Sequence, residues 1–111
     1  GVFDRVPKLK WGAIELGAVE RDRVVRRQLR VTPYPHEDSG WIVANAGEEA
    51  CLFSSDYPHV EGGRHPLKRF DQSLQGTPPS ALRRFYADNF IDLMGAGLAP
   101  ALRPPAQRAA A

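Results

Sequence analysis

The chain has 111 residues, of which 42% are apolar and 25% are charged, and its formal net charge is +2. This length accommodates one domain and is too short for two. The composition excludes a wholly disordered chain, because there is enough apolar material for a modest core. A charge of +2 does not by itself predict binding to nucleic acid, which requires positive side chains gathered on one surface.

The cysteine count and the lengths of the apolar stretches narrow the class of protein further. The single cysteine, Cys51, excludes an internal disulfide framework and a zinc site built from several cysteines. Because it lies in an apolar run, we expect a buried structural thiol and not a nucleophile. No apolar stretch approaches the ~20 residues that span a bilayer, and no secretory signal pattern opens the chain. We therefore expect a cytoplasmic protein with no membrane partner. The first residue, Gly1, is not methionine, which indicates a processed chain or the tail of something longer.

The predicted elements alternate between strands and helices. Residues 9–16 are apolar on both faces, which is typical of a strand in a parallel sheet that is covered by helices. The run EEACLFSS also lacks a polar face, and Pro and Gly residues separate the segments. This alternation predicts parallel βα units. In chain order, the predicted elements are a strand at 9–16, an arginine-rich helix to about Arg27, a strand at 28–32, a helix at 40–46, a strand at 48–55, and helices at 64–76 and 77–95.

The last predicted helix shows an apolar stripe of helical period, which we interpret as core packing. Residues 96–111 lose this periodicity and are rich in Pro and Ala, so we expect a domain at 1–95 followed by a flexible tail at 96–111. The stripe consists of Leu82, Phe85, Tyr86, Phe90, Leu93 and Met94.

The densest basic run is RDRVVRRQLR, from Arg21 to Arg30. It is typical of a solvated helix face, with Val24, Val25 and Leu29 turned inward. A phosphate-binding role is the alternative, although no aromatic side chains are interleaved to stack on bases. We expect no nucleic-acid partner.

Ionisable side chains follow each predicted strand at its carboxyl end. In parallel α/β architectures these ends converge on one crevice, where functional residues gather. The first strand ends at Glu15, the second leads to His36, and the third ends at Asp56 with His59 close behind. Glu15 fits a ligand, a base or a satisfied carboxylate, and His59 fits a ligand, a proton carrier or a histidine in a turn.

Asp56 is the strongest candidate for a metal-binding or proton-transferring residue. A carboxylate directly after a buried strand is partly desolvated, so its charge requires a cation, a metal or hydrogen-bond donors. A divalent metal would supply that partner, and the carboxylate would also take a proton from water bound to the metal. The alternative, which the pattern leaves equally open, is that Asp56 caps the next turn by accepting hydrogen bonds from the backbone around Tyr57 to His59.

The run LFSSDYPHVEGG, with a following helix and RFYADNFIDLMG, resembles the carboxyl-terminal part of the amidohydrolase-related metal-dependent enzymes. These are (β/α)8 barrels that include aminocarboxymuconate-semialdehyde decarboxylase and related hydrolases. The opening GVFDRVPKLKWGAIELGA resembles the segment that leads into and forms the sixth strand of that family. The resemblance covers about Gly1 to Gly95.

The resemblance implies a role for four residues. Asp56 matches the aspartate that ends the eighth strand and binds the catalytic metal. Glu15 falls where many members have a histidine, and His59 would lie beside the pocket. Asn89 matches a family asparagine, and we expect it to tie the last helix to the loop after the final strand.

This chain also departs from the family. The family's first metal ligands are a His-x-His pair, which the sequence lacks. A complete barrel needs about 250 residues, so 111 residues supply about three βα units of a (β/α)8 TIM barrel. We therefore expect a carboxyl-terminal fragment that is inactive alone and binds no metal tightly alone. Its remaining partners would be the missing amino-terminal barrel half, or further copies of itself.

The resemblance predicts the chemistry of the complete enzyme. A divalent metal, with zinc as the first choice, would support hydrolysis or non-oxidative decarboxylation of a small carboxylate or cyclic substrate. Asp56 would be the catalytic and metal-binding residue, with Glu15 and His59 in the substrate pocket. The alternative is a small non-catalytic α/β interaction or scaffold domain derived from such a barrel.

Overall fold

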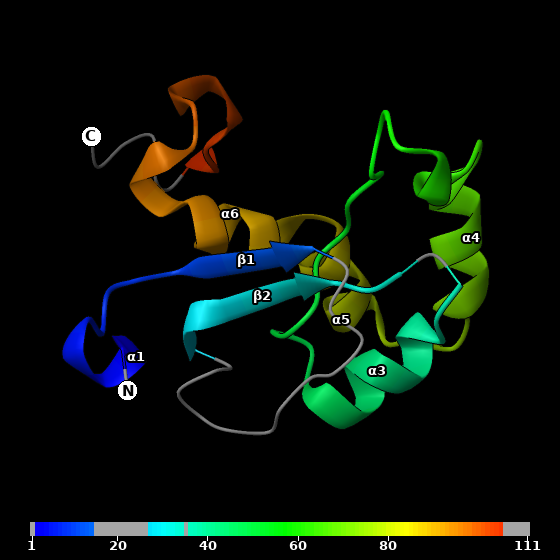
Figure 1. Ribbon diagram of the computed structural model, residues 1–111, viewed down its shortest axis with the longest axis horizontal. Helices are drawn as coiled ribbons and strands as arrows, with labels where there is room; N and C mark the ends of the chain where they lie inside the picture. Colours follow the sequence, from blue (N-terminus) through cyan, green and yellow to red (C-terminus); the bar gives the residue numbers. More distant parts are fainter. Residues whose placement is uncertain (1, 15–26, 35, 106–111) are drawn as a thin grey trace.

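The computed structural model describes residues 2–14, 27–34 and 36–105 (Figure 1). Within these ranges the chain forms two short strands and a set of short helices that surround them. None of the described helices has the length and apolar character that crossing a membrane requires. In chain order, the elements are α1 (Val2–Arg5), β1 (Trp11–Ile14), β2 (Leu29–Thr32), α3 (Ser39–Ala46), a 3-10 turn (Val60–Gly62), α4 (Pro66–Ser73), α5 (Pro79–Arg83), a π turn (Arg84–Asp88), α6 (Asn89–Met94), and 3-10 turns at Gly95–Gly97 and Pro100–Leu102.

The two strands form a parallel sheet, as the alternating pattern predicts. β1 pairs with β2 in a register that runs from Trp11 opposite Leu29 to Ile14 opposite Thr32. The chain is therefore a mixed α/β unit with a small parallel sheet, whereas its place in a barrel remains a prediction.

The third predicted strand, at 48–55, is present only as a single parallel bridge between Val31 and Cys51. The Val31 N–H donates to the Ala50 carbonyl at 3.0 Å, and the Leu52 N–H donates to the Val31 carbonyl at 2.9 Å. The next donor in such a ladder would be the N–H of residue 33, which is Pro33 and has none. The ladder therefore stops, and the Phe53 N–H donates to the Phe85 carbonyl of the π turn at 2.8 Å.

The core lies between the sheet and the helices α3, α4 and α5. Phe70 from α4 and Phe85 from the π turn are both almost fully buried, with their ring centroids 5.3 Å apart. Phe53 packs edge-on against Phe70 at 5.6 Å. The buried cluster consists of Val31, Val43, Ala46, Ala50, Cys51, Phe70, Leu74, Ala81 and Phe85.

The apolar stripe predicted for the last helix is only partly buried. Phe85 packs in the core, but Phe90 and Met94 are 44% and 40% exposed. The π turn inserts an extra residue into the helix, which rotates the following residues out of the 3.6-residue phase. Asn89, four residues after the buried Phe85, is itself almost fully buried although it is polar.

Polar side chains of α6 contact the amino ends of the strands. Asp92 forms ion pairs with Lys10, which precedes β1, at 3.0 Å and with Arg30 of β2. Burial pushes the pKa of Asp92 upward, but the hydrogen bonds and charges of Lys10 and Arg30 together outweigh it and leave that pKa below its usual value.

The side chain of Asn89 donates to the carbonyls of Glu48 and Cys51, both at 2.7 Å. The sequence-based expectation for Asn89 is thus wrong in one respect, because the helix is tied to the third sheet segment itself, at Glu48 and Cys51, and not to the loop after it.

The tail contains two 3-10 turns between Gly95 and Leu102. Leu98 is buried, and the Arg103 side chain donates to the carbonyls of Leu98 at 2.8 Å and Ala96 at 2.9 Å. Residues 106–111 of the predicted tail lie outside the described residues. The flexibility of the tail and the domain boundary at residue 95 stay predictions.

Candidate functional site

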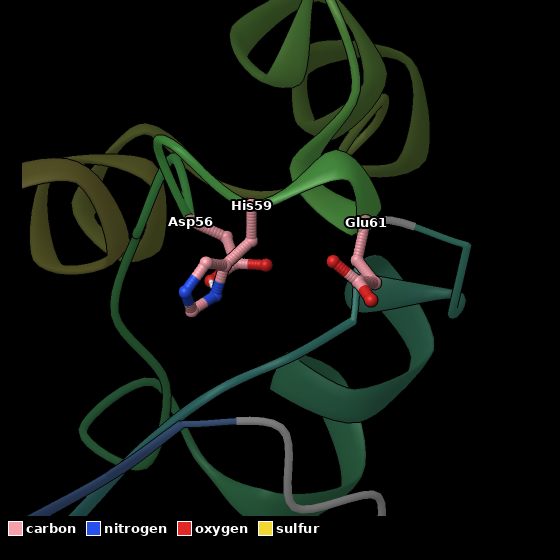
Figure 2. A group of neighbouring side chains, drawn as sticks. All are labelled: Asp56, His59 and Glu61. Atoms are coloured by element: carbon pink, nitrogen blue, oxygen red, sulfur yellow. Dashed lines mark hydrogen bonds and ion pairs between the residues drawn. The ribbon is translucent and has the colours of Figure 1, made fainter.

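Asp56, His59 and Glu61 gather on the loop that follows the third sheet segment (Figure 2). In Figure 1 this loop, drawn in green, lies beyond the arrowheads of β1 and β2, at the carboxyl ends of the strands. Figure 2 shows that the three side chains project from the same side of the loop. One ligand atom from each residue lies within 4.8 Å of the others.

The backbone of the loop is bent sharply at Asp56, whose φ is 54°. This left-handed conformation is unfavourable for most residues but is tolerated by Asp and Asn. Ser54 and Ser55 stabilise the bend, because their hydroxyl oxygens accept the N–H groups of Asp56 at 3.2 Å and Tyr57 at 3.3 Å. The two serines therefore shape the turn and position Asp56.

The Asp56 carboxylate contacts the His59 ring. A hydrogen bond between main-chain atoms closes the turn. The His59 N–H donates to the main-chain carbonyl of Asp56 at 2.8 Å. The carboxylate Oδ1 lies 3.1 Å from Nδ1 of the His59 ring, and the Asp56 side chain is only 14% exposed, against 69% for His59. The Asp56 carboxylate thus contacts the His59 ring, and its role in binding a metal or accepting a proton stays a prediction.

Glu61 belongs to this group, although the sequence analysis did not single it out. It lies in the 3-10 turn Val60–Gly62, which brings its carboxylate back toward Asp56 and His59. The spacing Asp-x-x-His-x-Glu within one turn is the signal that could have identified it.

The remaining predicted site residues lie elsewhere. Glu15 falls outside the described residues, so its place in a pocket stays a prediction. The His36 ring is 3.3 Å from the Arg69 guanidinium, and His65 directly precedes α4. Cys51 is fully buried, and burial, reinforced by the charge of Glu37, raises the pKa of its thiol to about 12. Cys51 therefore stays protonated near neutral pH, in agreement with a structural role.

Gly62 lies against the backbone of the bend. A Cβ atom at this position would be 2.2 Å from the carbonyl oxygen of Ser55 and 3.1 Å from Cβ of Asp56. We expect Gly62→Ala to displace the loop and to lower the free energy of unfolding by about 1–3 kcal/mol, the usual cost of overpacking. Urea unfolding measures the stability, and amide chemical shifts of Asp56 and His59 report the displacement.

Gly97→Ala is the matched control, because its Cβ would meet only Cε of Met94 at an ordinary 3.8 Å. Unchanged stability and unchanged Asp56 shifts in Gly62→Ala would contradict the close approach at Gly62.

Comparisons with known proteins give one solved structure. No family model matches the chain, and no curated protein matches it. The structure is similar to that of an amidohydrolase from Mycobacterium avium subsp. paratuberculosis K-10, with a TM-score of 0.71 and 31% sequence identity. The match covers 86% of this chain and 30% of the amidohydrolase.

The chain thus spans about a third of the length of the protein it matches, and it is folded like one part of an amidohydrolase. This agrees with the sequence-based resemblance to amidohydrolase-related enzymes and with the expected size of a fragment. The narrower likeness to the aminocarboxymuconate-semialdehyde decarboxylase branch stays a prediction.

Proposed function

We propose that this chain supplies the carboxyl-terminal corner of the active site of a metal-dependent amidohydrolase-type enzyme, with Asp56 as its metal-binding and proton-accepting residue. The observation that supports this proposal is the placement of a mostly buried Asp56 carboxylate at the carboxyl end of a parallel sheet, grouped with His59 and Glu61. The likeness to an amidohydrolase supports it independently.

The donor set fits a divalent cation. Two carboxylates and one imidazole offer the oxygen and nitrogen ligands that zinc accepts, and zinc is the metal that we propose. The two negative charges in this group offset the positive charge of the ion. Because these ligands come from one loop and two of the three residues are exposed, we propose weak binding by this chain alone and tight binding only in the complete site.

A bound divalent cation supplies Lewis acidity, which polarises a substrate carbonyl and makes a nearby water more acidic. The residues of this chain would divide the remaining work. Asp56 would accept a proton on a carboxylate oxygen, since its charge is held in a partly desolvated place. His59 would orient that carboxylate through the contact between Nδ1 and Oδ1.

The proposed reaction is hydrolysis or non-oxidative decarboxylation of a small carboxylate or cyclic substrate. The pocket would be lined by Glu15 and His59 and completed by the amino-terminal part of a barrel or by self-association. A non-catalytic interaction domain is the second candidate. It is favoured by Tyr57 and Val60, which are 89% and 87% exposed on the same loop.

A zinc titration of the purified 111-residue chain tests the proposal. We expect weak zinc binding that Asp56→Asn reduces by more than about tenfold, because losing a ligand costs at least as much as losing a group that orients one. Isothermal titration calorimetry measures the affinity, and thermal unfolding measures the stability of each variant.

Asp88→Asn is the matched control, since Asp88 is an exposed carboxylate paired with Arg83 at 3.0 Å, outside the Asp56–His59–Glu61 group. Equal zinc affinity in Asp56→Asn and the unchanged chain would contradict the proposal. Lost stability without any change in zinc binding would favour the non-catalytic domain. Tight stoichiometric binding by the unchanged chain would overturn the idea that its site is incomplete.

A further inference from the structure

A polar depression lies between the loop after β2 and helix α4. Its volume is about 630 Å³, and it is open to solvent. The lining residues are His36, Glu37, Asp38, Arg69, Gln72 and Ser73.

Two carboxylates at the edge of the depression accept hydrogen bonds from the backbone. Oε2 of Glu37 accepts the Tyr34 N–H at 2.7 Å, and Oδ1 of Asp38 accepts the Trp41 N–H at 2.9 Å at the start of α3. Both carboxylates are thus engaged by backbone donors, which hold them in place at the edge of the depression.

Arg69 has no such counterpart among the residues that the structure describes. The contact that its guanidinium makes there is with Nε2 of His36, at 3.3 Å, and no carboxylate of the described ranges forms an ion pair with it. Arg69 is only partly exposed, and its planar fork of donors matches the geometry of a carboxylate or phosphate group. The side-chain amide of Gln72 offers a further donor in the same depression.

The guanidinium also lies next to the loop that holds Asp56. A Cβ at Gly62 would be 3.1 Å from Cβ of Asp56, and a Cβ at Gly63 would be 3.1 Å from Cζ of Arg69. Consecutive Cα atoms are about 3.8 Å apart. Asp56 therefore lies beside Gly62, and Arg69 lies beside the next residue, Gly63. One small organic molecule could contact both side chains.

We propose that Arg69, together with His36, forms an anion subsite that holds a carboxylate group of the substrate beside the Asp56 loop. This inference rests on the proposed function and narrows its substrate class to small molecules with a carboxylate, in preference to neutral amides or lactones. Arg69 is a binding residue in this scheme and takes no part in proton transfer.

The test is a titration of the metal-free 111-residue chain with three probes, followed by nuclear magnetic resonance. Benzoate is a cyclic carboxylate, benzyl alcohol is its neutral counterpart, and inorganic phosphate is a second anion. We expect benzoate to shift the signals of His36 and Arg69 and benzyl alcohol to leave them unchanged. Arg69→Gln should weaken benzoate binding about tenfold, the loss typical of one charge-assisted contact.

Arg64→Gln is the matched control, because Arg64 is exposed one residue after Gly63 and does not line the depression. Arg69→Lys keeps the positive charge but loses the planar set of guanidinium donors. Its affinity for benzoate should therefore lie between those of the unchanged chain and Arg69→Gln. Arg69→Lys also serves as the second variant if Arg69→Gln loses the dispersed spectrum of a folded chain.

Benzoate binding that is absent, or equal in Arg69→Gln and Arg64→Gln, would overturn the subsite. Phosphate binding tighter than benzoate binding would overturn its assignment to a carboxylate. Asp56→Asn separates this inference from the proposed function, since it should weaken zinc binding by more than about tenfold and leave benzoate binding intact. Failure of zinc binding alone would refute the metal site, and failure of benzoate binding alone would refute the subsite.

Discussion

Replacing Phe85 by alanine is expected to lower the free energy of unfolding by about 3–5 kcal/mol, the range for removing a buried aromatic side chain. The Phe85 ring is almost fully buried and packs against Phe70 at 5.3 Å and Tyr86 at 5.1 Å. Its removal leaves a cavity where α4, the π turn and the third sheet segment meet. Small domains have a total stability of only about 5–15 kcal/mol, so the variant should be close to unfolding. Urea denaturation followed by circular dichroism measures the change.

Phe90→Ala is the matched control on the same helix. Phe90 is 44% exposed and lies beyond the π turn, so its removal should cost well under half as much. Equal losses in the two variants would show that the π turn does not separate a buried face from an exposed one.

Asn89→Ala is expected to lower the free energy of unfolding by about 2–4 kcal/mol, because it leaves two carbonyl oxygens without their donor. Those oxygens belong to Glu48 and Cys51, and both accept the Asn89 amide at 2.7 Å. The effect should be strongest near Cys51, since its hydrogen bond is fully buried. Hydrogen exchange at the amides of Leu52 and Phe53 should therefore accelerate more than exchange in α3.

Asn45→Ala controls for the loss of an asparagine amide. Asn45 donates to the Trp41 carbonyl at 2.8 Å on the exposed side of α3, and an alanine there should change stability by less than about 0.5 kcal/mol. Exchange that accelerates uniformly across the molecule in Asn89→Ala would argue against a local tie between α6 and the strand that leads to Asp56.

Local chemistry explains which parts of the fold were predictable. Proline and glycine mark the ends of the elements, so the order of strands and helices follows from the sequence. The approach of His59 to Asp56 was also predictable from local chemistry, because the two residues lie three positions apart in a tight turn. Such features depend only on neighbours along the chain.

The features that the sequence did not predict depend on contacts between residues far apart in the chain, or on a break in the helical period. The third strand stops early because Pro33, eighteen residues before Cys51, withholds a donor from the ladder. The π turn interrupts the hydrophobic period of the last helix. The burial of the polar Asn89 depends on hydrogen bonds to the carbonyls of Glu48 and Cys51, 41 and 38 positions earlier. The contact of Arg69 with His36 joins residues 33 positions apart, so only the folded chain shows a depression between them.

The left-handed backbone at Asp56 determines how a mutational scan of this loop should be interpreted. Its φ of 54° is tolerated by asparagine nearly as well as by aspartate, but costs most other residues roughly 1–2 kcal/mol. An alanine at this position would remove the charge and strain the main chain at once, and its phenotype would mix chemistry with folding. Asparagine removes the charge alone. In a systematic scan, a position such as this would score as essential for a mixture of reasons that alanine cannot separate.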